Sequence, residues 1–267
     1  MYKVNGKTAY LGDENSYSHA AASRLADELV GYGSMRKVFD AVTGGECEYA
    51  VLPVENNVEG AVNEVYDELF DCRLFIARQI VLPVRHSLIA ASGATLDGIK
   101  RVVSHPQAIG QCRKFLGGLP VTVEAVSSTS AALLRADRET AAIALKPRDG
   151  QTVIAKGIQD SALNATRFAL LSEERSTAGG KVSVCFDLKN EPGALLNVLD
   201  VIYRRAVNLT RILSRPHRSG DGEYRFFVDF DFDRPQSELD ALMADVAKSC
   251  SAFGFLGRYD CTVAEDI

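Results

Sequence analysis

Apolar and polar positions along the first 171 residues alternate between two periods. Apolar residues three and four positions apart predict amphipathic helices, as in the run Val62–Leu69. Another helical run follows the first predicted strand and extends through Leu25 and Leu29. Between these runs, short apolar segments predict β-strands at 8–11, 49–54, 74–84, 87–91, 101–104, 121–126, 141–145 and 167–171. Strands that alternate with helices predict an α/β fold.

The pattern changes after residues 172–181, a polar and Gly-rich segment without periodicity that is typical of a linker. Beyond it, the order of predicted elements is β-α-β-β-α-β, which is the ferredoxin-like order. The predicted strands lie at 182–188, 208–214, 224–232 and 255–263, and the predicted helices at 192–203 and 235–252. We therefore expect a catalytic-sized domain over residues 1–176 and a smaller α+β domain over residues 177–267.

Length, charge and composition narrow the function classes. A chain of 267 residues suits two domains. Its net charge of −5, without a basic tract, argues against nucleic-acid binding. No stretch approaches the roughly 18 uncharged residues of a membrane span, and the first residues lack the apolar core of a signal peptide, so we expect a cytoplasmic protein and no membrane partner. The six cysteines and four histidines form no CxxC or HExxH pair, and we therefore expect no metal.

Three polar loops each leave the carboxyl end of a predicted strand and enter a helix: Gly12–His19, Val54–Glu64 and Ser104–Gln107. Open α/β sheets bind ligands at that end, where helix N-termini favour anions. None of these loops has a phosphate-loop pattern, so a small carboxylate is a better ligand than a nucleotide cofactor. Each loop also has a structural interpretation, since Ser104 can cap a helix and Asn56 can occupy a turn.

Several motifs, in the same order, resemble the prephenate dehydratase family over nearly the whole chain. The first unit carries YLGDENSYSH, VLPVENNVEGAVNEVYDEL, SHPQAIGQCRKFL, SSTSAAL and NATRFALL. The second carries PGALLNVL and NLTRILSRP, and resembles an ACT regulatory domain. The resemblance implies a catalytic unit of two α/β lobes, similar to periplasmic binding proteins, with the site in the cleft between them, followed by a ferredoxin-like ACT domain.

The resemblance also implies an activity. Members of this family decarboxylate and dehydrate prephenate to phenylpyruvate during phenylalanine synthesis, without a metal or an organic cofactor. We therefore expect prephenate as the substrate and a homodimer or homotetramer. The expected allosteric effector is L-phenylalanine, bound between ACT domains as a feedback inhibitor.

The matching motif positions imply individual site residues. Thr166, in the TRF motif, matches the residue that the family treats as essential for catalysis. The positions that match substrate-binding residues are Ser16, Asn56, Ser104, Gln107, Arg167 and Phe168. The positions that match effector-binding motifs are Gly193, Ala194, Leu195, Asn208, Leu209 and Ser214.

The chain departs from the family pattern at several of these motifs. The usual GPxGT loop reads Gly12–Ser16, which adds Asp13 beside Glu14. Two acids near an anion site would weaken substrate binding unless their side chains point away. The segment 146–157 replaces an Ala-rich and Tyr-Gly-Leu-rich stretch in the second lobe, and Leu213 replaces the glutamate of the ESRP motif.

The reaction defines what the residues must do. Aromatisation of the prephenate ring supplies the driving force, so the protein must bind two carboxylates and help hydroxide to leave. Arg167 suits a carboxylate, and Thr166 can donate a hydrogen bond to the leaving oxygen. An alcohol is a weak proton source, so a titratable neighbour is a rival proton donor. The candidates for that donor are His19, His105, Glu55 and Glu59.

Two alternatives stay open at this point. The substrate can be arogenate, which carries an amine where prephenate has a keto group, and Asp13 or Glu14 would then meet the ammonium. Alternatively, the chain can be a non-catalytic bilobal protein that binds and senses an aromatic acid. For the second domain, a dimerisation module without a ligand is the alternative to an effector sensor.

Overall fold

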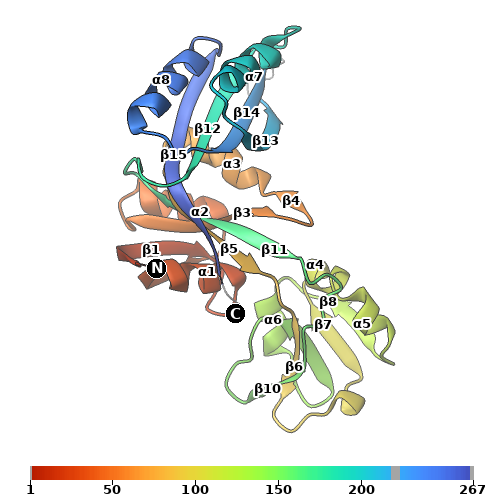
Figure 1. Cartoon of the computed structure of the whole chain (residues 1–267). Coiled ribbons are helices and arrows are strands. Elements are labelled where there is room, and N and C mark those ends of the chain that lie inside the picture. The colour runs from red at the N-terminus through yellow and green to blue at the C-terminus, as the bar shows by residue number, and fades with distance from the viewer. Residues whose placement is uncertain (1, 218–222, 265–267) are drawn as a thin grey trace.

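The first lobe is built on β-strands from both ends of the N-terminal unit. The structure is a computed structural model, and it describes residues 2–217 and 223–264 (Figure 1). The chain leaves this lobe after β5 and returns to it in β11, which pairs antiparallel with β5. The elements of this lobe are β1 (Val4–Leu11), α1 (Tyr17–Leu25), β2 (Ala26–Tyr32), α2 (Met35–Thr43), β3 (Tyr49–Asn56), β4 (Gly60–Ala61), α3 (Asn63–Asp71), β5 (Phe75–Pro83) and β11 (Ala165–Ser172).

The second lobe is an insertion between β5 and β11, and it folds around its own five-stranded sheet of order β10-β6-β9-β7-β8. Its central strand β9 is fully buried, with helices packed against the sheet. The elements of this lobe are β6 (Ser87–Ala91), η1 (Leu96–Gly98), β7 (Arg101–Ser104), α4 (Pro106–Gly110), α5 (Arg113–Gly117), β8 (Thr122–Ala125), α6 (Thr129–Leu134), β9 (Thr140–Ala144) and β10 (Gln151–Lys156).

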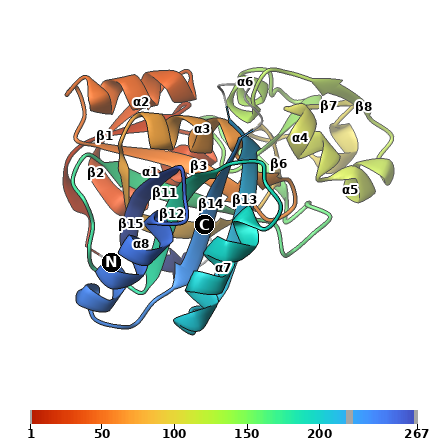
Figure 2. The same ribbon diagram turned by 90° about the horizontal axis from the view of Figure 1, so that it is seen from above.

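The C-terminal domain has the expected ferredoxin-like order, with both helices on one face of its sheet (Figures 1 and 2). Val182, Val184 and Phe186 alternate towards those helices and form the domain's core. The elements are β12 (Lys181–Leu188), α7 (Ala194–Arg204), β13 (Leu209–Pro216), β14 (Tyr224–Asp231), α8 (Gln236–Ala247) and β15 (Ala252–Val263). The predicted fold class, a bilobal α/β unit with a ferredoxin-like domain, is confirmed.

One strand joins this domain to the first lobe. The second half of β15 pairs parallel with β5, from Asp260 opposite Arg78 to Val263 opposite Val81. The two sheets thereby become one ten-stranded sheet of order β13-β14-β12-β15-β5-β11-β3-β1-β2, with β4 added beside β3. The sheet face opposite α7 and α8 also packs on α3, where the rings of Tyr66 and Phe227 lie 5.0 Å apart.

Two predicted segments differ from the structure. The helix expected to run through Leu29 ends at Leu25, and residues Ala26–Tyr32 form β2, parallel to β1. Gly31 is required there, because a Cβ at this position would lie 2.4 Å from the carbonyl oxygen of Gly12. The polar segment after β9 contains β10, which the sequence did not predict, and which pairs antiparallel with β6.

Candidate active site

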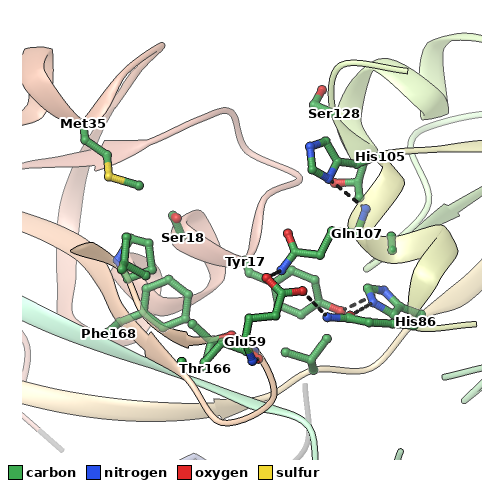
Figure 3. Close-up of a pocket in the computed structure, with 18 of the residues that line it drawn as sticks. Tyr17, Ser18, Met35, Glu59, His86, His105, Gln107, Ser128, Thr166 and Phe168 are labelled. Atoms are coloured by element: carbon green, nitrogen blue, oxygen red, sulfur yellow. Dashed lines mark hydrogen bonds between the residues drawn. The ribbon is translucent and has the colours of Figure 1, made fainter. Parts of the chain in front are cut away.

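A cavity of about 590 Å³ lies between the two lobes, and both lobes contribute side chains to it (Figure 3). The first lobe contributes residues from α1, the end of β3, the loop after it, and β11. The second lobe contributes residues from the first turns of α4 and α6 and from the segments before them. The polar lining residues are Tyr17, Ser18, Asn56, Glu59, His86, His105, Gln107, Gln111, Ser127, Ser128, Thr129 and Thr166.

The antiparallel ladder between β3 and β11 positions Thr166. Thr166 lies opposite Asn56, and both side chains line the cavity. The register shifts after Arg167, so that Phe168 lies opposite Pro53 and one extra residue of β3 is accommodated. Such a bulge changes the direction of neighbouring side chains and is common beside active sites. Here Thr166 and Phe168 both reach the cavity.

Asn56 determines how the Thr166 hydroxyl can act. The Asn56 Oδ1 atom accepts hydrogen bonds from the backbone N–H groups of Val58 and Glu59, at 2.9 and 3.1 Å. Because backbone N–H groups only donate, this amide has one possible orientation. Its Nδ2 atom then donates to Thr166 Oγ1 and to Asn164 Oδ1, both at 2.9 Å. Thr166 oxygen is thus an acceptor from Asn56, and its own hydrogen is available to a ligand in the cavity.

Glu59 bridges the two lobes across the cavity (Figure 3). Its two carboxylate oxygens accept hydrogen bonds from the Nε2 atoms of Gln107 and Gln111, at 2.6 and 3.2 Å. Gln111 Oε1 then lies 2.8 Å from the Nε2 atom of His86. Since that amide oxygen can only accept, His86 carries its hydrogen on Nε2, and its Nδ1 faces the Tyr17 hydroxyl at 3.4 Å.

Burial lowers the pKa of His86 below its ordinary value of 6.5, although the hydrogen bond with Gln111 opposes that shift. The folded protein therefore holds His86 neutral at a pH where the unfolded chain binds a proton. Unfolding then takes up a proton, so stability falls as the pH falls below about 6.5. In His86→Gln, we expect a smaller decrease in melting temperature between about pH 7.5 and about pH 5.5 than in the wild type. Equal decreases in the two proteins would refute this role of His86.

Four of the expected substrate-binding and catalytic residues meet at the cavity, namely Asn56, Gln107, Thr166 and Phe168. Three others do not line it. Ser16 caps α1 by accepting from the His19 backbone N–H, at 3.1 Å. Ser104 is fully buried and donates to the Ile143 carbonyl oxygen, at 2.7 Å. For these two serines, the structural interpretation describes the geometry better than substrate binding.

Arg167 differs most clearly from its expected place. Successive side chains of a strand point to opposite faces, so Arg167 lies on the face away from Thr166 and Phe168. Its NH1 group donates to Glu55 Oε2 at 2.9 Å, towards the C-terminal domain. The proposed fork to a substrate carboxylate is therefore not formed at this cavity. Glu55, one of the rival proton donors, lies on the same face as Arg167 and is also absent from the cavity lining.

The added acid in the Gly12–Ser16 loop is paired with residues of the second lobe. Asp13 Oδ1 accepts from the Ser130 hydroxyl at 2.5 Å, and Asp13 Oδ2 lies 3.7 Å from Arg148. Both partners belong to the second lobe, and Arg148 lies in the segment that departs from the family pattern. The two departures therefore compensate each other, because the charge of Asp13 is directed to Arg148.

The other candidate proton donors also divide into residues that line the cavity and residues that do not. His105 and Glu59 line the cavity, whereas His19 does not and packs against the Tyr10 ring. Burial, followed by the charge of Lys146, lowers the pKa of His19. His105 accepts from the Gln107 backbone N–H at 3.3 Å and begins α4. It therefore has a structural role in addition to its position at the cavity.

Among the polar lining residues, Tyr17, His86 and Gln111 were not singled out from the sequence. Tyr17 belongs to one of the polar strand-end loops, so its loop position was a usable signal. His86 lies between β5 and β6, where the chain first crosses between the lobes, and the Tyr17 hydroxyl donates to the neighbouring Arg85 carbonyl oxygen. No sequence pattern marks the point where the chain passes from one lobe to the other, so His86 could not be identified as a site residue from the sequence.

The expected effector residues fall into two groups on the C-terminal domain. Gly193, in a left-handed conformation with φ of 85°, begins α7 and is followed by Ala194 and Leu195. The strand register places Ser214 towards that same end of the domain, whereas Asn208 and Leu209 lie at the other end. Leu213, which replaces the motif glutamate, packs against the core shared with the first lobe.

Two other kinds of site have no candidate among the described residues. Residues 2–217 and 223–264 hold no group of three or more His, Cys, Asp or Glu side chains arranged for a metal ion. Within the same ranges, no helix has both the length and the apolar character needed to cross a membrane.

Comparisons with known proteins agree with this architecture. A prephenate dehydratase family model matches residues 8–176, and an ACT domain model matches residues 183–247. The prephenate dehydratase of Lactococcus lactis is 37% identical over 242 residues, covering 84% of this chain and 86% of the relative. Arogenate dehydratase 1 of Petunia hybrida is 35% identical over 288 residues, covering 97% of this chain and 68% of the relative.

A solved structure extends the comparison to three dimensions. The prephenate dehydratase of Arthrobacter aurescens, determined in complex with L-Phe, superimposes with a TM-score of 0.85 at 29% identity, covering 96% of this chain and 90% of that one. The family model covers more than half of the present chain, and the structural match spans both lobes and the C-terminal domain. The chain therefore belongs to the prephenate dehydratase family and carries an ACT domain.

Proposed function

We propose that this protein converts prephenate to phenylpyruvate, carbon dioxide and water, as the first step after prephenate towards phenylalanine. The observation that carries this proposal is the Thr166 hydroxyl at the cavity, with its oxygen accepting from Asn56 and its hydrogen available to a ligand. The family to which the chain belongs, and the name of its Lactococcus lactis relative, support the same substrate.

The chemistry needs little from the protein beyond binding and one hydrogen bond. As the ring carboxylate leaves as carbon dioxide, the electrons of its C–C bond enter the ring. The C–O bond at the opposite carbon breaks, and hydroxide departs with the electron pair of this C–O bond. A hydrogen bond from Thr166 stabilises the developing negative charge on the departing oxygen, and the hydroxide then takes a proton from solvent. The aromatic ring that forms provides the driving force.

Neutral groups bind the two carboxylates in this proposal. Within the described part of the chain, no Lys or Arg is among the residues that line the cavity. The first turns of two helices face it instead, at Tyr17 of α1 and Thr129 of α6. Helix N-termini present free N–H groups and a partial positive charge, which stabilise carboxylates. Serine hydroxyls at residues 18, 127 and 128 add further donors.

Arogenate is the second candidate substrate, because Glu59 places a carboxylate in the cavity. The side-chain amine of arogenate is a cation, and Glu59 is able to pair with it. In the structure, Glu59 is already held by Gln107 and Gln111, which favours prephenate. Asp13, which the sequence suggested for this role, is directed to Ser130 and Arg148.

The direct test is turnover of the purified protein with each substrate. With prephenate we expect phenylpyruvate, measured by its ultraviolet absorbance in alkali, and with arogenate we expect a kcat/KM at least about tenfold lower. A reversed preference would make the protein an arogenate dehydratase. If neither substrate reacts but both bind in calorimetry, the protein is a non-catalytic binder of aromatic acids.

For the ACT domain we propose L-phenylalanine as a feedback inhibitor, bound between two copies of the chain in a homodimer or homotetramer. The two groups of effector residues support this arrangement, since they lie at opposite ends of one domain and one chain alone does not bring them together. The Arthrobacter aurescens relative was determined with L-Phe. We also propose a cytoplasmic location, because all six cysteines are free, as a reducing compartment would keep them.

A further inference from the structure

The strand pair that positions Thr166 has a second face. Asn56 and Thr166 are opposite each other on the cavity side, and their sequence neighbours Glu55 and Arg167 are opposite each other on the other side. The backbone connects the two pairs rigidly, because adjacent residues of one ladder move together. A displacement of Glu55 or Arg167 therefore changes the position of the catalytic hydroxyl.

Glu55 is shared by two arginines. Its Oε2 atom lies 2.9 Å from Arg167 NH1 and 3.8 Å from Arg211 Nε. The Arg211 side chain is 8% exposed, and its guanidinium lies 4.2 Å from the centre of the Tyr66 ring. Neither terminal nitrogen of Arg211, nor Arg167 Nε, has a hydrogen-bond partner among the described residues, although all three are buried.

Unsatisfied buried donors are costly, so each arginine competes for Glu55. In the structure, Glu55 forms its hydrogen bond with Arg167. A small movement of Arg211 towards Glu55 would exchange one ion pair for the other. The cluster thus has two arrangements of similar chemistry, which is the requirement for a switch between two states.

Arg211 lies on β13, between the expected effector residues Leu209 and Ser214. On its other side, Arg211 NH1 is 3.5 Å from Asp229 Oδ2, and Asp229 accepts from the Ser183 hydroxyl at 2.5 Å. Ser183 also contacts the hydroxyl of Tyr259, on the strand β15 that pairs with β5. The charged cluster therefore connects the sheet of the ACT domain to the back of the catalytic strand pair.

We infer that Glu55 and Arg211 are positioning residues that connect the effector strand of the ACT domain to the Thr166–Asn56 pair. This inference rests on the proposed function. When β13 changes its position on effector binding, Arg211 draws Glu55 away from Arg167, and the β3–β11 ladder moves Thr166 out of its catalytic position.

The test uses the full chain, with prephenate as substrate and phenylalanine as effector. The first variant is Arg211→Met, which keeps the length of the side chain over Tyr66. We expect phenylalanine to bind to it with a dissociation constant within about twofold of the wild type, measured by calorimetry. Inhibition at saturating phenylalanine should fall at least about fivefold. Arg211→Lys keeps a cation beside Glu55 and should retain most of the inhibition. In Glu55→Gln we expect a lower kcat with an unchanged KM, because the substrate does not contact this residue.

The matched control is Asp67→Asn. Asp67, on α3 of the first lobe, accepts two hydrogen bonds from Arg215 of the same strand β13, at 3.0 and 2.8 Å. This pair also connects the first lobe to the ACT domain, but neither residue belongs to the β3–β11 ladder. The Asp67→Asn variant should keep both turnover and inhibition. Equal loss of inhibition in Asp67→Asn and Arg211→Met, or an unchanged kcat in Glu55→Gln, would overturn the inference. Failure of the wild type to turn over prephenate, or to respond to phenylalanine, would instead overturn the proposed function.

Discussion

Replacing Thr166 by valine is expected to lower kcat for prephenate by about two to three orders of magnitude, with a change in KM of less than about threefold. Valine has the shape of threonine but no hydroxyl, so the cavity keeps its walls and loses the hydrogen bond to the leaving oxygen. Because that bond forms fully only as charge develops, its loss affects the transition state more than substrate binding. Steady-state kinetics of phenylpyruvate formation measures both quantities.

Thr166→Ser is the matched control for this experiment. It keeps the hydroxyl next to Asn56 Nδ2 and should retain at least about a tenth of the wild-type kcat. A valine variant that turns over prephenate as fast as the serine variant would remove Thr166 from the mechanism. The pH dependence gives a separate check, since a threonine hydroxyl does not titrate near neutrality. An inflection of kcat below pH 6.5 would point to His86 as the proton donor, because burial lowers its pKa from that ordinary value.

The second large effect is expected from Asn56→Asp. The aspartate keeps the acceptor for the backbone N–H groups of Val58 and Glu59, but it places an oxygen where Nδ2 faces Thr166. The Thr166 hydroxyl would then donate to this carboxylate, and its hydrogen would no longer be available to the substrate. We expect kcat to fall by about two orders of magnitude, close to the effect of losing the hydroxyl itself.

Asn57→Asp provides the matched control for Asn56→Asp. Asn57 is adjacent in the sequence, and its Oδ1 atom accepts from the Ala165 backbone N–H at 2.9 Å, which an aspartate would also do. Its Nδ2 atom donates to the Leu163 carbonyl oxygen, so Asn57→Asp removes an amide donor from this turn just as Asn56→Asp does. Asn57 does not line the cavity. We therefore expect its kcat to stay within about fivefold of the wild type. Similar losses in both variants would indicate a general effect of negative charge at this turn, and the specific role of the Asn56 amide would be rejected.

Much of the fold could be predicted from the sequence, because local and tertiary preferences agree there. The apolar stripe of Val62–Leu69 matches the observed burial of α3. Val182–Leu188 is a strand as predicted, although it is buried on both faces and not on one. The errors occur where tertiary pairing decides. The spacing of Leu25 and Leu29 predicts a helix, but parallel pairing with β1 makes residues 26–32 a strand. β10 has no periodic pattern, and it is a strand because β6 is beside it.

The candidate site illustrates the same limit at the level of single residues. Motif positions led to both Thr166 and Arg167, although consecutive residues of one strand cannot both face one cavity. The period of the strand could have separated them, but the choice of face could not be predicted without the second lobe. In the structure, the Arg167 guanidinium forms its hydrogen bond with Glu55, on the face of the strand pair opposite Thr166 and Asn56.

The strand β15 has a consequence for folding and solubility. Within the described residues, β5 has β11 on one side and the last residues of β15 on the other. The ACT domain therefore covers an edge of the first-lobe sheet in addition to its proposed regulatory role. Without β15, the backbone N–H and C=O groups of β5 that pair with it would face solvent, forming an edge that can pair with other chains. A strand of the proposed effector-binding domain thus also protects the edge of β5 against pairing with other chains.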